Sequence, residues 1–175
     1  MKKTIFILTL LFVISCTNIN KKDFTPVKNL YTNGFSFEEG DILILNKLAN
    51  MYSVFGHSAI VLDKGKVGEY PMYGYGYIEV GLGEWIESSL DRGIIILRTD
   101  LDNEQKEKLK NLIIEYSTGV YGIFNKKMSK EEFYCSSFVW KVYYELGIDL
   151  KENFNFFVFP YDFLKTDKLK KVSSP

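Results

Sequence analysis

The stretch GHSAIVLDKGKVGE, residues 56–69, has the pattern of a β-hairpin and carries the chain's single histidine. Residues 57–62 form a short apolar run typical of a strand, and a second strand is expected over residues 67–72. The three residues 63–65 between them end in a glycine, which adopts positive φ without steric cost. The pattern therefore predicts an antiparallel pair of strands joined by a three-residue loop.

The length of this loop decides which side chains share a face with His57. A three-residue loop places Glu69 on the same face, one diagonal step away and within side-chain reach. A four-residue loop would turn Glu69 to the other face and put Tyr70 in its place. The glycine favours the shorter loop, so Glu69 is the leading candidate to orient the imidazole. Glu79 and Glu84 are weaker candidates, and a solvated strand carboxylate is the alternative role for Glu69.

A second motif, FYCSSFVWK at residues 133–141, begins a predicted helix over residues 136–146 that ends before Gly147. Free N–H groups and the helix dipole at such a start favour a thiolate at Cys135. The same N–H groups can receive the oxyanion of a tetrahedral intermediate. A buried, inert cysteine that packs at the helix start is the alternative.

A thiol and an imidazole are the minimum set of groups for nucleophilic catalysis by a thiolate. Gly56 leaves space beside His57, although a core histidine with a satisfied hydrogen bond is the alternative role for this residue. A third group is needed to orient the imidazole and to stabilise its charged form. We therefore predict a site built from Cys135, His57 and Glu69.

The N-terminus has the pattern of a secretory signal. Lys2 and Lys3 precede an apolar run over residues 5–14 that is too short to span a bilayer. Its ending, VISC at residues 13–16, looks like a bacterial lipobox, with cleavage before Cys16 and a lipid on that residue. A plain signal peptide that happens to end near a cysteine is the alternative.

The lipobox predicts three segments: a signal peptide (1–15), a flexible lipid-anchored tether (16–35) and a single catalytic domain (36–175). The protein is then exported and held on a membrane of the bacterial cell envelope by Cys16. With only two cysteines in the chain, Cys135 is left without a disulfide partner. There is no Cys/His cluster, so no metal site is predicted. Lys plus Arg and Asp plus Glu balance at 22 each, which argues against a nucleic-acid partner.

The remaining elements indicate an α+β fold with a mostly antiparallel sheet. They are a strand at 42–45, a loop or short helix at 47–55, a Gly/Tyr-rich loop at 73–81, a short helix at 84–90, a strand at 93–98, a helix at 101–117, a single turn begun by a capping box at Ser129, a tail strand at 156–159 and a turn or short helix at 160–164.

Four pieces of the chain resemble the circularly permuted NlpC-type papain-like superfamily: GDIL at 40–43, GHSAIV at 56–61, Glu69 and the FYCSSFVWK stretch. The YiiX-like branch is most similar, and lecithin:retinol acyltransferase is a more distant relative. Papain-like enzymes normally present Cys before His, and permutation explains the opposite order here. The resemblance implies a small antiparallel β-barrel or sheet packed against a helix that starts at the nucleophilic Cys135. It also implies His57 as base and acid, Glu69 as the orienting residue, and no metal or cofactor.

The function that we expect is a thiol hydrolase that cleaves an amide bond, with cell-wall stem peptides or other small peptides as the implied substrates. Tyr134, Tyr70 and Tyr161 are the predicted substrate-binding residues, and PYD at 160–162 resembles a tail segment near the site in YiiX-like proteins. A lipid acyl hydrolase or acyltransferase of the same fold is the first alternative. A binding lipoprotein without turnover is the second.

Overall fold

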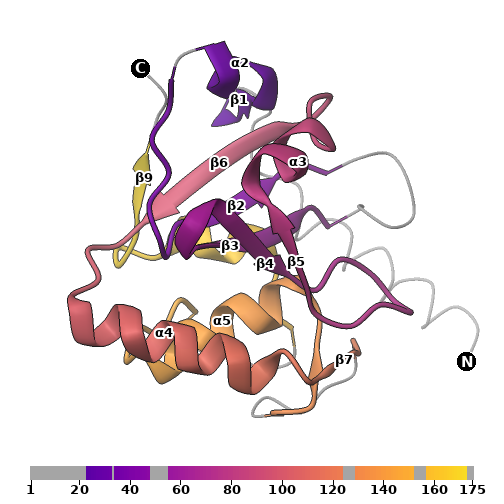
Figure 1. The fold of residues 1–175 in the computed structure, drawn as a ribbon, viewed down its shortest axis with the longest axis vertical. Helices are drawn as coiled ribbons and strands as arrows, with labels where there is room; N and C mark the ends of the chain where they lie inside the picture. The colour runs from indigo at the N-terminus through magenta and orange to yellow at the C-terminus, as the bar shows by residue number, and fades with distance from the viewer. Residues whose placement is uncertain (1–22, 33, 48–54, 124–128, 152–156, 173–175) are drawn as a thin grey trace, which may run out of the picture.

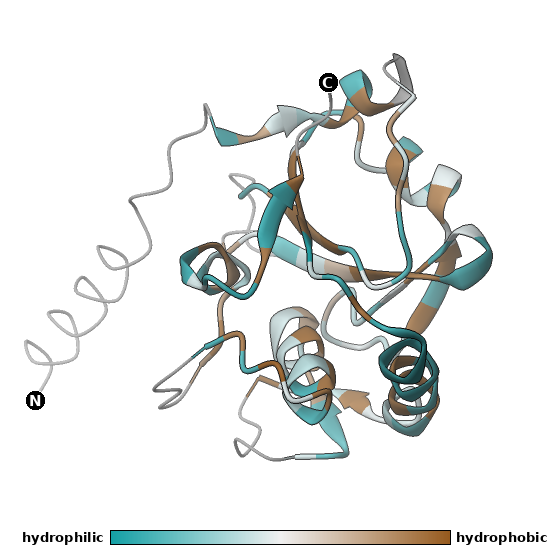
Figure 2. Ribbon diagram, turned by 90° about the vertical axis from the view of Figure 1, so that its left-hand side faces the viewer, coloured by the Kyte–Doolittle hydropathy of each residue, from teal (hydrophilic) through white to brown (hydrophobic). Residues whose placement is uncertain are grey.

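The computed structural model describes residues 23–32, 34–47, 55–123, 129–151 and 157–172. A curved sheet has two longer helices, α4 and α5, on one side and the short helices α2 and α3 on the other (Figures 1 and 2). The elements in chain order are β1 (Thr25–Pro26), α2 (Val27–Thr32), β2 (Ile42–Leu45), β3 (His57–Leu62), the 3₁₀ turn η2 (Asp63–Gly65), β4 (Lys66–Glu69), β5 (Ile78–Gly81), α3 (Leu82–Glu87), β6 (Gly93–Arg98), α4 (Asn103–Tyr116), β7 (Val120–Tyr121), β8 (Glu132–Phe133), α5 (Cys135–Glu145), the 3₁₀ turn η3 (Pro160–Lys165) and β9 (Lys170–Val172).

The main sheet has the strand order β1-β6-β2-β3-β4-β5, and β9 also pairs with β6. All of its described pairings are antiparallel. The separate pair β7–β8 is parallel. The predicted α+β class with a mostly antiparallel sheet is therefore confirmed.

Two apolar cores lie on the two faces of this sheet. Ile42 and Ile44 face the core beneath α4 and α5, while Leu43 and Leu45 face the core covered by α2 and α3. Successive side chains of a strand point to opposite faces, so a strand that is buried on both sides needs an unbroken apolar run. This explains why β2 and β6 carry no polar position in their central residues (Figure 2).

The hairpin has the predicted register, because Leu62 pairs with Lys66 and Val61 with Val67. The glycine of the loop adopts the expected positive φ of 67°, and Lys64 before it also lies in the left-handed region at φ 55°. The register puts Glu69 at the end of β4, close to His57 at the start of β3. β4 ends at this residue, so it is shorter than the predicted strand.

Most predicted elements are present with shifted ends. α5 begins at Cys135, one residue before the predicted helix, and α4 is slightly shorter than predicted, with the Asp102 carboxylate accepting from the Gln105 N–H as its cap. The prediction of a loop over 73–81 is wrong at its end, where β5 pairs with β4 despite its glycine. The predicted loop at 47–55 lies largely outside the described residues.

Ser129 accepts hydrogen bonds from the N–H groups of Glu131 and Glu132, as the capping-box pattern predicted, and the chain then enters β8. The prediction of a tail strand is wrong where the structure describes that segment. Residues 157–159 of the expected tail strand are not in a strand. The η3 turn follows them, as the Pro160 pattern predicted.

The predicted tether is wrong for its second half. Thr25 and Pro26 pair with β6, and Val27 and Leu30 of α2 are buried in the core above the sheet. Two apolar side chains one helical turn apart give this segment a face to bury, which outweighs its polar composition. None of the helices in the described ranges is both long and apolar enough to cross a bilayer.

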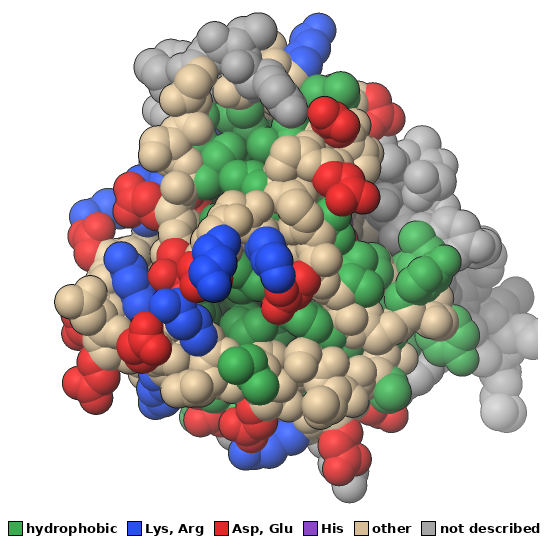
Figure 3. All heavy atoms as spheres, in the orientation of Figure 1, with side chains coloured by type: hydrophobic (Ala, Val, Ile, Leu, Met, Phe, Trp, Pro, Cys, Tyr) green, Lys and Arg blue, Asp and Glu red, His purple; other side chains and the backbone are tan. Residues whose placement is uncertain are grey.

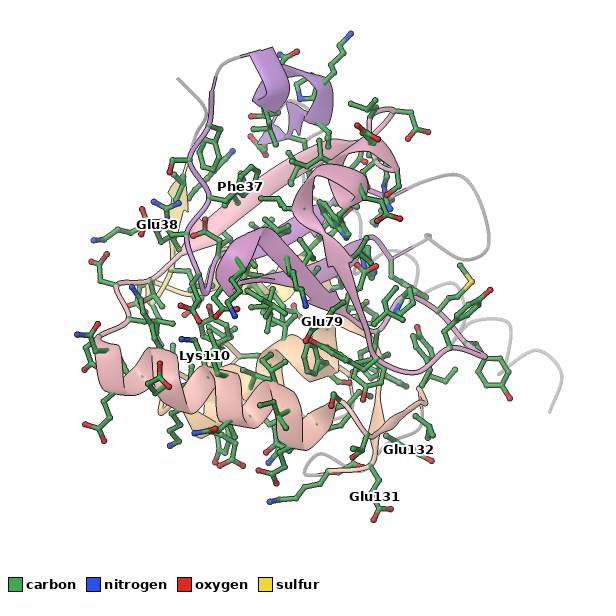
Figure 4. All side chains as sticks on the ribbon, in the orientation of Figure 1. Phe37, Glu38, Glu79, Lys110, Glu131 and Glu132 are labelled. Atoms are coloured by element: carbon green, nitrogen blue, oxygen red, sulfur yellow. The ribbon has the colours of Figure 1, made fainter. Side chains whose placement is uncertain are left out.

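The surface in the view of Figure 3 mixes acidic and basic side chains. Many of them pair with one another: Lys66 Nζ lies 2.9 Å from Glu79 Oε2, and Lys110 Nζ lies 2.9 Å from Glu107 Oε1. Figure 4 labels Glu79 on β5 and Lys110 on α4 at this face. The face therefore carries local charge pairs instead of a patch of one sign.

Candidate active site

His57 and Glu69 meet at the ends of β3 and β4. The His57 Nε2 atom lies 2.7 Å from Glu69 Oε2, and the two side chains are only 12% and 9% exposed. The predicted hairpin register is the cause of this contact, because it places both residues on one face at the same end of the hairpin. Of the candidate carboxylates, Glu69 is thus the one that reaches His57. The exposed Glu79 instead pairs with Lys66.

Gly56 makes the turn that delivers His57 to this position. Its φ is +82°, and a Cβ atom would stand 2.8 Å from the Leu45 carbonyl oxygen and 3.1 Å from the Tyr161 ring. The Tyr161 hydroxyl, which would also meet that Cβ, accepts a hydrogen bond of 2.7 Å from the Lys47 N–H after β2. Glycine is required here both for its conformation and for its small size.

Cys135 is the first residue of α5 and contacts His57 through a hydrogen bond between the two side chains. Because Glu69 occupies Nε2, the other ring nitrogen, Nδ1, is left for the interaction with the thiol. The Ser58 backbone N–H also hydrogen-bonds the thiol group. The Ser136 hydroxyl acts on the thiol as well, although it donates its own proton to the Val158 carbonyl oxygen at 2.7 Å. The sulfur therefore sits among donors at a helix N-terminus, which is the setting that stabilises a thiolate.

The three groups shift one another's protonation. Burial alone would lower the pKa of His57, but the Glu69 charge and the hydrogen bonds with Cys135 and Glu69 raise it above its ordinary 6.5. Burial would raise the pKa of Cys135, yet the hydrogen bond with His57 and its charge hold it below 9.0. Burial would likewise raise the pKa of Glu69, but the His57 charge and the hydrogen bonds with His57 and Trp85 together hold it below its ordinary value. The pair thus favours thiolate and imidazolium over thiol and imidazole.

Trp85 is a fourth member of this group that the sequence did not identify. Its indole Nε1 donates a hydrogen bond of 2.8 Å to Glu69 Oε2, the same oxygen that His57 contacts. Trp85 lies in α3 and is 3% exposed. A tryptophan in a short helix is ordinarily a core residue, so nothing in the sequence indicated that Trp85 belongs to the site.

A pocket of about 220 Å³ opens at the sulfur and the imidazole. Its walls are mainly aromatic and aliphatic, and its polar side chains are few. The lining residues are Phe55, Gly56, His57, Pro71, Tyr121, Ile123, Tyr134, Cys135, Ser136, Phe157, Val158, Phe159 and Pro160. Tyr121 and the segment 157–159 are wall residues that the sequence did not suggest.

The three predicted substrate-binding tyrosines lie in different places. Tyr134 lines the pocket, and its hydroxyl accepts from the Val158 N–H at 2.9 Å. Tyr70 is fully buried, donates to the Tyr116 carbonyl and packs among the core rings, so its predicted role is wrong. Tyr161 is buried behind Gly56 and does not line the pocket, which contradicts its predicted role as well.

Among the described residues, no group of three or more His, Cys, Asp or Glu side chains is arranged to hold a metal ion. The polar groups of the site instead satisfy one another in a chain from Trp85 through Glu69 and His57 to Cys135. Such a chain is the arrangement expected for a thiol nucleophile with its base and an orienting carboxylate.

The fold and this arrangement define the class of a papain-like thiol hydrolase in which His precedes Cys. The family model described as "Permuted papain-like amidase enzyme, YaeF/YiiX, C92 family" matches residues 36–173, and the chain belongs to that family. It is thereby a member of a family of cysteine peptidase- and amidase-like enzymes, as the sequence predicted.

A crystal structure of yiiX from Escherichia coli O157:H7 has the same fold, with a TM-score of 0.63 at 20% sequence identity. The match covers 81% of this chain and 99% of that one, and the E. coli protein is described as a metalloprotein. At this identity the likeness shows the fold alone. No curated protein gives a significant match to the sequence.

Proposed function

We propose that the protein hydrolyses amide bonds of peptides with Cys135 as nucleophile, His57 as base and acid, and Glu69 as the orienting carboxylate. The observation that carries this proposal is the single histidine held between the Glu69 oxygen and the Cys135 sulfur at the mouth of a pocket. The membership of an amidase family agrees with it.

In the first step the Cys135 thiolate attacks the carbonyl carbon and the C=O electrons move onto oxygen. The free N–H groups of the first turn of α5 receive this oxyanion. As the C–N bond breaks, the His57 imidazolium gives its proton to the leaving amine, and a thioester remains on Cys135. In the second step His57 takes a proton from water, the hydroxide attacks the thioester, and the acid leaves with restoration of the thiolate and imidazolium.

The substrates in this proposal are cell-wall stem peptides or other small peptides, met outside the cytoplasm. The support for export is the N-terminal pattern: two lysines, an apolar run, and the lipobox-like residues 13–16. Lipid on Cys16 would hold the catalytic domain at a membrane of the cell envelope. Labelling of cells with a palmitate analogue tests this part, because the wild-type chain would be labelled and Cys16→Ala would not.

The catalytic part is tested by the pH dependence of Cys135 alkylation with iodoacetamide. The expected profile has its acid limb well below that of an ordinary thiol, and this limb moves up in His57→Ala. Digests of purified muropeptides then show whether new amines and carboxyls appear with the wild type and not with Cys135→Ala. An ordinary thiol profile that is unchanged by the His57 substitution would refute the proposed mechanism.

A second candidate, lipid acyl hydrolysis or transfer by the same residues, is favoured by one observation. The pocket wall beside the sulfur is apolar, with Phe157, Phe159 and Ile123 among its residues, and such a surface fits an acyl chain better than a charged peptide. Product analysis on phospholipid vesicles beside the muropeptide digests separates the two candidates. Release or transfer of fatty acyl groups without peptide cleavage would favour the second.

A further inference from the structure

The Glu69 carboxylate receives two hydrogen bonds on one oxygen. His57 Nε2 lies 2.7 Å and Trp85 Nε1 lies 2.8 Å from Oε2. The carboxylate is 9% exposed and the tryptophan 3%. The Trp85 N–H thus fixes where that oxygen stands, and the oxygen in turn fixes the imidazole.

We propose that Trp85 is a positioning residue of the hydrolytic site, whose indole N–H holds the Glu69 carboxylate in the place from which it orients His57 toward Cys135. This inference rests on the proposed function, because it assigns Trp85 a part in the same proton-transfer chain. Trp85 itself lines no part of the pocket wall and touches no substrate in this scheme.

The physical role of such a donor is to keep a buried carboxylate both charged and oriented. A carboxyl group taken out of water favours its neutral form unless donors replace the lost hydration. A neutral Glu69 would no longer stabilise the imidazolium that pairs with the thiolate. A charged but rotating Glu69 would leave the imidazole free to turn away from the sulfur.

Other charged and titratable groups also face Glu69. They come from three elements: His57 on β3, Arg92 in the turn before β6, whose charge acts on the carboxylate, and Tyr77 beside β5. Arg92 is held by the Asn46 carbonyl oxygen through Nη2. Of the residues described around Glu69, the hydrogen bonds to its carboxylate come from His57 and Trp85, so these two side chains control its position.

The chain contains a matched control for a substitution at Trp85. The second of its two tryptophans, Trp140 in α5, is 2% exposed and also donates its indole N–H to a carboxylate, Asp149 Oδ1, at 3.0 Å. Trp85→Phe and Trp140→Phe thus remove the same ring area and the same kind of hydrogen bond. Only the first lies on the chain of groups that ends at Cys135.

The experiment compares the pH dependence of Cys135 alkylation by iodoacetamide in the full chain, its two Trp→Phe variants and His57→Ala. In Trp85→Phe the acid limb is expected to move up by about one pH unit, because Glu69 takes up its proton at higher pH without the donor. Amide hydrolysis is expected to lose roughly tenfold in kcat with little change in KM. Trp140→Phe is expected to lower the Tm while its alkylation profile stays that of the wild type.

A shape-conserving replacement keeps the test valid if Trp85→Phe does not fold. Incorporation of benzothienylalanine, which has sulfur in place of the indole N–H, into the Trp140→Phe background changes position 85 alone. A profile that superimposes on that of Trp140→Phe overturns the inference. A second test is epistasis with Glu69→Ala, since the Trp85 substitution is expected to have no further effect on the profile once the side chain that accepts its N–H is gone.

Failure of this inference and failure of the proposed function give different results. If the proposed function fails, the wild type and His57→Ala share an ordinary thiol profile, and the inference falls with it. If the inference alone fails, the wild type keeps a low, His57-dependent acid limb, and both forms of the position-85 change reproduce it.

Discussion

Two buried carboxylates lie on the same sheet and have opposite kinds of partners. Asp41, fully buried before β2, accepts hydrogen bonds of 2.7 and 2.8 Å from Arg98 and one of 2.9 Å from the Glu38 N–H. Glu69 is held by His57 and Trp85. Arginine keeps its proton at every accessible pH, whereas histidine can give its proton away. The first pair therefore fixes the chain in place, and the second can do chemistry.

The strongest test of this difference between the two carboxylates is to remove His57, the titratable partner of Glu69. In His57→Ala the thiolate of Cys135 loses its hydrogen bond and its counter-charge, so alkylation by iodoacetamide at pH 6 should fall roughly a hundredfold. Unchanged alkylation would mean that the contact with His57 does not activate the sulfur.

Removal of Arg98, the permanently charged partner of Asp41, should lower the stability of the fold and leave the reactivity of Cys135 unchanged. Arg98→Ala leaves the buried Asp41 carboxylate with only a backbone donor, and we expect a loss of about 2–4 kcal/mol in the free energy of unfolding. Chemical denaturation measures this loss, and Cys135 alkylation of the folded variant should be that of the wild type. A variant with full stability would show that the two carboxylates do not differ in the way described.

Glu69→Gln sharpens the comparison further because it keeps the shape and removes the charge. The amide can still accept from Trp85, but it stabilises the imidazolium less, so kcat should fall about tenfold to thirtyfold. The basic limb of the pH profile should move down, since the pKa of His57 loses the Glu69 charge that raises it. Steady-state kinetics over pH give both values, and an unmoved basic limb would contradict the assignment.

The smallest expected effect is on stability against pH. The lowered pKa of Glu69 contributes stability above its ordinary 4.5, and this is lost as pH falls through the folded value. The raised pKa of His57 contributes stability below its ordinary 6.5, and this is lost as pH rises through the folded value. The contribution of the pair is thus complete between 4.5 and 6.5.

The Tm of the wild type should therefore exceed that of Glu69→Gln by the largest amount within that pH window. The difference should become smaller at lower and at higher pH. Thermal unfolding at a series of pH values measures it. A difference that stays constant from about pH 3 to 10 would show that the pair is not linked to folding.

The parts of the site that the sequence predicted are those set by local rules. Glu69 followed from the glycine of the hairpin loop, because loop length fixes register and register fixes the face. The helix start that carries Cys135 followed from the apolar spacing of α5. Both depend on residues that are close in the sequence or on the period of a single element.

The same rule of alternation explains one of the errors. Tyr70 follows Glu69 directly, so if the carboxylate faces His57 the tyrosine must face the opposite core, where it packs against Phe133 and Phe138. The two side chains therefore could not both face His57, and the alternation alone predicts this.

The other features that the sequence did not predict arise from tertiary contacts. Trp85 reaches Glu69 from a separate helix, and the pocket wall is completed by residues 157–160 from the far end of the chain. No spacing in the sequence reports which distant segment closes a pocket. The burial of Val27 and Leu30 was not predicted for the same reason, since the surface that they pack against is made by strands that come later in the sequence.

The edge of β6 has a topological consequence. β9 runs along it from Arg98 to Ile96, and β1 continues in the same direction from Ile94 to Gly93, with Ile95 between them. The two segments from opposite ends of the sequence thus form one interrupted edge strand, head to tail. A chain joined there and opened elsewhere would keep every other strand in place. In a fold with this geometry, the order of the elements along the sequence can be circularly permuted at little structural cost. The order of His57 before Cys135 in this chain is the order that such a permutation produces.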